Sequence, residues 1–165
     1  MNYSIKEISK LAIIAATYTV VTVILAPISY GSIQVRLSEA LTLLPFYLGT
    51  PAAISLWLGC MLANYLGGTG IIDIIFGSLL TLIAGLFTAK SKNLYTAGIY
   101  PVLFNAFGVA LILHYTVKSP YWLTVLYVAF GQFVSVYIVG IILMRLLERY
   151  DIFEKIKIRN SDQLS

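Results

Sequence analysis

Charged side chains are scarce in this sequence. Of its 165 residues, 11% are charged and 59% are apolar, whereas a soluble domain carries about 25% charged residues. So few charges cannot cover the surface of a soluble globule, and the composition therefore predicts an integral membrane protein. The net charge of +4 does not indicate nucleic-acid binding, because the basic residues stand at the ends of apolar segments, where they set membrane topology.

Several chemical signatures are missing as well. A single cysteine, Cys60, excludes an internal disulfide, and the sequence contains no spacing typical of a zinc or iron–sulfur site. It has no phosphate loop of the form GxxxxGK(S/T) that would bind ATP, and no nucleophile paired with a base. These absences predict a protein that is not an enzyme and that holds no metal or cofactor.

The apolar residues fall into six runs separated by short polar or glycine-rich segments. This pattern predicts an all-α membrane protein, a compact bundle of six transmembrane helices that forms a single integral membrane domain over residues 1–165. No internal repeat or domain linker interrupts it. The expected spans are residues 8–26, 33–47, 52–66, 71–89, 95–115 and 121–147, followed by a cytoplasmic tail at 148–165.

Basic residues gather on one side of this predicted bundle. Six spans place both ends of the chain on the same side, and nine Lys and Arg residues then share that side, against Lys118 on the other. Cytoplasmic loops carry such an excess of positive charge, so we expect both termini to be cytoplasmic. The nine residues are Lys6, Lys10, Lys90, Lys92, Arg145, Arg149, Lys155, Lys157 and Arg159.

A few polar side chains interrupt the predicted spans. A charge near the bilayer centre costs roughly 2.5–3.5 kcal/mol on insertion scales, so such residues favour a functional site. Arg36 and Glu39 are three residues apart, and on a helix they would share a face and could touch each other or one ligand. With the expected topology the cluster faces the outer leaflet, as a capture site would. The candidate binding residues are Arg36, Glu39, Asn64, Asp73, Asn105, Gln132 and, in the loop before the second span, Tyr30.

A structural interpretation of these residues stays open. Arg36 could pair with Glu39 or Asp73 and only hold the bundle together. Asp73 could also be only a first-turn residue that the helix dipole favours. Asn and Gln in membrane helices often only bridge neighbouring helices, and tyrosines such as Tyr30 gather at membrane interfaces without a ligand.

Two stretches make the pattern more specific. PISYGSIQVRLSEALTLLPFY and LGCMLANYLGGTGIIDIIFGSLLTLIAG, which lie between Pro27 and Gly85, resemble the QueT family, the substrate-binding S components of energy-coupling factor (ECF) transporters. The resemblance implies a six-helix S component in the bacterial plasma membrane that takes up a queuosine precursor, a 7-deazaguanine such as preQ1. It also implies partners, namely a transmembrane coupling protein and two cytoplasmic ATPases, which agrees with the missing phosphate loop.

The resemblance also suggests roles for single residues. In such transporters a small-residue face of the first helix docks on the coupling protein, and Ala12 and Ala16 match that face. PreQ1 has a guanine-like edge that a carboxylate can bind and a cationic aminomethyl group, which suits Glu39 and Asp73 beside Arg36. Two alternatives stay open: a stand-alone secondary transporter, and a structural membrane subunit in which these three charges only form an ion-pair lock.

Overall fold

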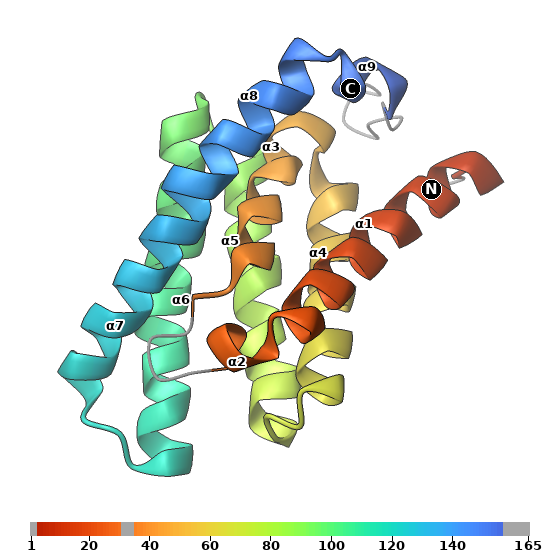
Figure 1. The fold of residues 1–165 in the computed structure, drawn as a ribbon. Helices are drawn as coiled ribbons and strands as arrows, with labels where there is room; N and C mark the ends of the chain where they lie inside the picture. Colours follow the sequence, from red (N-terminus) through yellow and green to blue (C-terminus); the bar gives the residue numbers. More distant parts are fainter. Residues whose placement is uncertain (1–2, 31–34, 157–165) are drawn as a thin grey trace.

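A computed structural model describes residues 3–30 and 35–156 and shows a bundle of helices (Figure 1). Within these ranges the chain forms no β-strand, which confirms the predicted all-α class. The elements are α1 (Ile5–Ile24), α2 (Ala26–Ser29), η1 (Leu37–Leu43), α3 (Leu44–Leu48), α4 (Thr50–Leu66), η2 (Asp73–Gly77), α5 (Ser78–Ala89), α6 (Leu94–Val117), α7 (Tyr121–Phe133), η3 (Val134–Gly140), α8 (Ile141–Arg149) and α9 (Ile152–Lys155). Of the three irregular segments, η1 is a 3₁₀-helix and η2 and η3 are π-helical.

Within the described residues, three helices are long and apolar enough to cross a membrane. They span Ile5–Ile24, Leu94–Val117 and Tyr121–Arg149, the last of which joins α7, η3 and α8 without a break. Large apolar side chains such as Leu126 and Phe130 are exposed on their outer surfaces, where lipid tails rather than water suit them. Two further apolar helical segments, Leu37–Leu48 and Asp73–Ala89, are shorter than these three.

The segment formed by η1 and α3 runs through the centre of the bundle (Figure 1). Its first part, η1, contacts α1, α4, α5, α6, α8 and η3. Leu43, Leu44 and Leu48 are buried in the main apolar core together with side chains from α1, α4 and α8. Glu39, at the opposite end of the segment, is 1% exposed. A short helix is possible at this place because other helices surround most of it, so it need not match the thickness of the bilayer.

The start of this central helix corrects one sequence prediction. The helix begins at Leu37, and Arg36 precedes it with an extended backbone (φ −90°, ψ 99°). The prediction that Arg36 and Glu39 stand on one helical face was therefore wrong for Arg36. An extended residue at this point lets the guanidinium reach across to α4 instead of lying over its own helix. Residues 33–34 of that expected span lie outside the described residues, as do 157–165 of the expected tail with Lys157 and Arg159.

Local sequence explains several helix ends. Ser4 and Glu7 form a capping box at the start of α1, and the Asn93 side chain accepts a 2.9 Å hydrogen bond from the Thr96 N–H at the start of α6. Gly49, with φ 72°, makes the one-residue turn between α3 and α4, a conformation that glycine adopts without strain. The start of α1 and the helix α9 lie at the same end of the bundle (Figure 1).

Candidate functional site

A polar cavity lies beside η1, where six elements meet. Its lining comes from the start of η1 and from α4, η2, α5, α6 and α7. Six of the seven predicted binding residues line it, although they lie up to almost one hundred positions apart in the sequence. They are Arg36, Glu39, Asn64, Asp73, Asn105 and Gln132, and the wall is completed by Gly77, Thr81, Val109 and Val128.

Glu39 is the most deeply buried acid of this cavity. Its Oε1 accepts a 2.5 Å hydrogen bond from the Tyr18 hydroxyl, and its Oε2 accepts a 3.2 Å bond from Asn105 Nδ2. Each carboxylate oxygen can accept about two hydrogen bonds. One acceptor position on each oxygen of Glu39 is therefore still open to a ligand.

Arg36 is held by neutral groups. Its Nη2 donates to Asn64 Oδ1 at 2.9 Å and its Nε to the Ser29 carbonyl at 3.5 Å. No carboxylate among the described residues forms an ion pair with this guanidinium. Glu39 and Asp73 thus form no ion pair with Arg36. The structure does not contain the ion pair among these three residues that was one of the alternatives from the sequence.

Asn64 connects Arg36 to the turn that carries Asp73. Besides accepting from Arg36, its Nδ2 donates to the Asp73 carbonyl at 3.0 Å and to Ser78 Oγ at 3.4 Å. Asn64 is 1% exposed, and these bonds satisfy both ends of its amide. Its side chain therefore organises the wall of the cavity and leaves little capacity for a ligand.

Asp73 opens the π-helical turn η2. Its side chain is half-buried and lines the cavity, yet its carboxylate makes no hydrogen bond or ion pair with any described residue. Single π-helical turns occur often at functional sites because they redirect side chains. The carboxylate is thus available for a cationic group that enters the cavity.

Gln132 is the other lining residue that has no partner in the described part of the chain. It is 3% exposed, and its buried Oε1 accepts no hydrogen bond from a described residue. Leaving a buried polar group unsatisfied costs about 1–3 kcal/mol. A ligand that donates to this amide would remove that cost.

Tyr30 is the predicted binding residue that does not line the cavity. Its ring lies against the Arg36 guanidinium, with 5.2 Å between the guanidinium carbon and the ring centroid, and its hydroxyl donates to the Ala63 carbonyl at 2.7 Å. This position suits a cation–π contact that steadies Arg36. A direct stack of Tyr30 on a ligand stays a prediction.

The cavity is small. The space that a water molecule could occupy is about 10 Å³, which is about enough for one water. A bicyclic ligand would have to part the lining side chains. The formal charges of the lining are one positive (Arg36) and two negative (Glu39 and Asp73), so the site has an excess of one acid.

Five residues of the site escaped the sequence prediction. Tyr18 binds Glu39, and four others line the cavity, namely Gly77, Thr81, Val109 and Val128. Tyr18 could have been found from its spacing, because Ile14, Tyr18 and Thr22 recur every four residues and form a buried stripe of α1 that mixes polar with apolar side chains. Gly77 belongs to the motif DIIFGS but gives no chemical signal of its own.

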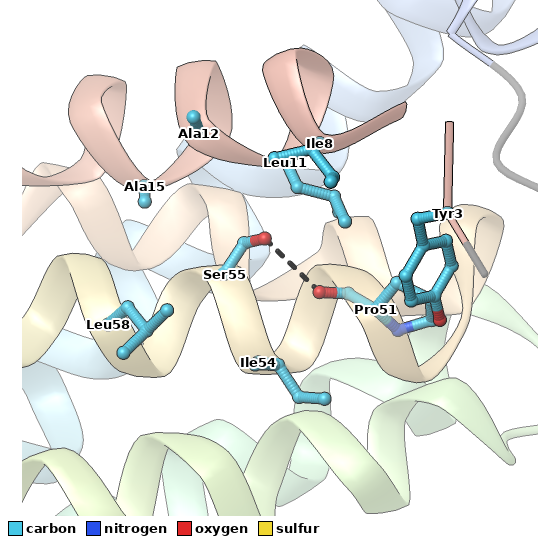
Figure 2. A pocket seen from close by; sticks show the side chains of 9 residues that line it. All are labelled: Tyr3, Ile8, Leu11, Ala12, Ala15, Pro51, Ile54, Ser55 and Leu58. Atoms are coloured by element: carbon cyan, nitrogen blue, oxygen red, sulfur yellow. Dashed lines mark hydrogen bonds between the residues drawn. The ribbon is translucent and has the colours of Figure 1, made fainter. Parts of the chain in front are cut away.

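A second cavity lies between α1 and α4 (Figure 2). It measures about 270 Å³ and is lined almost entirely by apolar groups. Ala12 and Ala16, the predicted docking residues, are both exposed on α1; Ala12 lines this cavity and Ala16 does not. The lining residues are Tyr3, Ile8, Leu11, Ala12, Ala15, Pro51, Ile54, Ser55 and Leu58.

Comparison with known proteins gives matches over most of the chain. A family model described as QueT transporter matches residues 8–149. The queuosine precursor transporter QueT of Lactococcus lactis subsp. cremoris (strain MG1363) is 32% identical over 162 residues, which cover 88% of this chain and 95% of that protein. No solved structure matches.

Proposed function

Because the chain belongs to the QueT transporter family, we propose that it is the substrate-binding S component of an ECF-type transporter and captures a queuosine precursor in the polar cavity. As a member of a transporter family with several apolar helices, it is a membrane protein and not an enzyme. The proposed ligand is a 7-deazaguanine such as preQ1. The family and the relative support the substrate class, and the cavity supports the place where it binds.

The observation that carries the proposal is the pair of unused polar groups in the cavity wall. The Gln132 amide and the Asp73 carboxylate face the same cavity as Glu39, and neither has a partner among the described residues. Buried polar groups in native proteins are nearly always hydrogen-bonded, so the buried Gln132 Oε1 needs an explanation; the half-buried Asp73 carboxylate adds a second acceptor in the same cavity. A polar ligand provides that explanation.

The chemistry of a 7-deazaguanine matches these groups. Its N1–H and exocyclic amine can donate to one carboxylate, and a further N–H of the ligand can donate to Gln132 Oε1, the buried acceptor that has no hydrogen bond among the described residues. The cationic aminomethyl group of preQ1 then requires a second acid, and charge-assisted bonds of this kind are roughly twice as strong as neutral ones. We assign Glu39 to the guanine-like edge, because its position is fixed, and Asp73 to the cation.

Binding to charge-removal variants tests the proposed site. With the purified protein, we expect Glu39→Gln and Asp73→Asn each to weaken preQ1 binding about tenfold or more, since a hydrogen bond to a charged group contributes about 1.5–3 kcal/mol. Isothermal titration measures this loss. Glu154→Gln and Asp151→Asn, which remove exposed acids near α9, are the matched controls and should bind as the parent does. If both cavity variants also bind as the parent does, the site is wrongly assigned.

The remaining parts of the S-component assignment are proposals as well. We propose six membrane spans in the bacterial plasma membrane with both termini cytoplasmic, and as partners a coupling protein and two ATPases. The exposed Ala12 and Ala16 on α1, next to the apolar cavity of Figure 2, support α1 as the docking surface for the coupling protein. Uptake of preQ1 into liposomes by this chain alone, without ATPases, would instead favour a stand-alone transporter.

A further inference from the structure

Tyr18 reaches the buried acid of the cavity from the side of α1. Its side chain is 0% exposed, and its hydroxyl donates to Glu39 Oε1 at 2.5 Å. Tyr18 itself does not line the cavity. Glu39 is thus bonded on one oxygen to a residue behind it and on the other to Asn105, which lies in the cavity wall.

These two bonds fix the orientation of the Glu39 carboxylate. A free carboxylate side chain would lose rotamer freedom when a ligand binds, which costs about 0.5–1.5 kcal/mol. Tyr18 and Asn105 impose that order before the ligand arrives. They also supply two donors to a carboxylate that is 1% exposed and that forms no ion pair with Arg36.

We propose that Tyr18 is a positioning residue for ligand capture, which orients Glu39 toward the cavity and sets the affinity through that carboxylate alone. The inference rests on the proposed function, because it takes Glu39 to be a ligand contact. It makes α1 a functional part of the binding site although the helix contributes no residue to the cavity wall.

A second bond between the same two elements offers a matched control. One turn further along α1, Thr22 is also 0% exposed. Its hydroxyl donates to the Tyr18 carbonyl at 2.7 Å and shares a 2.6 Å hydrogen bond with the Ser38 hydroxyl of η1. Neither Thr22 nor Ser38 lines the cavity. Thr22→Val therefore removes a buried hydrogen bond between α1 and η1, together with the bond to the Tyr18 carbonyl within α1, and leaves both hydrogen bonds of the Glu39 carboxylate in place.

A double-mutant cycle on ligand affinity tests the proposal. Isothermal titration of preQ1 into the purified full chain is compared for the parent, Tyr18→Phe, Glu39→Gln, the double variant and Thr22→Val. We expect Tyr18→Phe to weaken binding about tenfold in the parent and less than about twofold in the Glu39→Gln background. Thr22→Val should lower the thermal midpoint, as Tyr18→Phe does, while binding preQ1 within about twofold of the parent.

Each contrary result is decisive. Equal losses from Tyr18→Phe in both backgrounds, or an equal loss from Thr22→Val, would show that Tyr18 only supports the fold. A parent that does not bind preQ1 overturns the proposed function and this inference together, whereas a Glu39→Gln loss without a Tyr18→Phe loss overturns the inference alone.

A gentler perturbation covers the case in which Tyr18→Phe does not fold. Incorporation of 3-fluorotyrosine at position 18 keeps the ring and the hydroxyl in place but strengthens the phenol as a donor. We expect it to change preQ1 affinity by about twofold or more in the parent and to have no effect in the Glu39→Gln background. The same change in both backgrounds would refute the role of Tyr18.

Discussion

Polar side chains of the cavity differ in how many of their hydrogen-bonding groups are already in use. Asn64 uses both ends of its amide to hold Arg36 and the Asp73 carbonyl, and Glu39 has one bond on each oxygen. Gln132 and the Asp73 carboxylate have none among the described residues. A group that is already satisfied gains little from a new partner. The affinity for a ligand should therefore depend most on Gln132, Asp73 and the open positions of Glu39.

Gly77 has no Cβ, and this leaves space in the cavity wall next to Asp73 and Asn64. A Cβ at this position would lie 3.1 Å from Asp73 Oδ1 and 3.5 Å from Asn64 Nδ2, and the backbone is helical (φ −59°, ψ −44°). Ala favours a helix by about 0.5–1 kcal/mol over Gly. We expect Gly77→Ala to leave the thermal midpoint unchanged or higher and to weaken preQ1 binding about tenfold, because it narrows the site and displaces Asp73.

Thermal unfolding and isothermal titration on the same protein sample separate these two effects. A variant that loses affinity and stability together would show that Gly77 is needed for the fold. A variant that binds as the parent does would show that the ligand does not approach this part of the wall.

The binding residues could be found from the sequence to the extent that their burial is costly. Arg36, Glu39 and Asp73 are conspicuous because a charge at membrane depth needs a reason, and the structure places all three at one cavity. Gly77 and Tyr18 carry no charge, and a tyrosine at membrane depth has many possible uses. Their roles depend on which atoms face them in the fold, and a single sequence does not contain that information.

Helices could be located from the sequence, but their irregular parts could not. The six predicted segments all correspond to helical regions of the described chain, because long apolar runs between glycine, proline and charge signals determine them. Each irregular segment belongs to the site or adjoins it. The 3₁₀-helix η1 carries Glu39, the π-helical η2 carries Asp73, and the π-helical η3 begins two residues after Gln132. Such shifts in hydrogen-bond register follow from packing between elements, as the extended backbone of Arg36 does.

For α1, the exposed face predicts a separation of two activities. Ala12 and Ala16 lie on the outside of the helix, whereas Tyr18 points inward to Glu39. We expect Ala12→Trp combined with Ala16→Trp to abolish preQ1 uptake in cells that contain the coupling protein and the ATPases, because large side chains keep a docking helix away. Binding of preQ1 to the purified variant should stay within about twofold of the parent.

Leu111→Trp provides the control for this experiment. Leu111 is exposed on α6, away from α1, so the substitution adds the same bulk to the membrane-facing surface without blocking the proposed docking face. It should transport as the parent does. Loss of ligand binding in the double Trp variant would show that the small-residue face of α1 is needed for the fold and is not a docking surface.

Over the whole molecule, the chain runs up and down through the bundle in alternating directions (Figure 1). Its first and last described helices meet at one end, where Lys10 Nζ donates to the Lys155 carbonyl at 3.0 Å. The connection between α5 and α6, with Lys90 and Lys92, lies at that end too, and the connection between α6 and α7 lies at the other. Apart from Arg36 in the cavity wall and Lys118 after α6, the basic residues of the described chain therefore gather at the end that we propose to be cytoplasmic.

Cysteine labelling tests this orientation directly. Cys60 is buried, and Cys60→Ala gives a background without thiols. In that background we expect Val117→Cys, at the exposed end of α6, to react with a membrane-impermeant maleimide in intact cells. Lys92→Cys, exposed between α5 and α6, should react only after the membrane is permeabilised. If instead Lys92→Cys reacts in intact cells and Val117→Cys reacts only after permeabilisation, the orientation of the bundle is the opposite of the proposed one. That result would contradict an outward-facing capture site. Reaction of both cysteines in intact cells would show that α6 does not cross the bilayer.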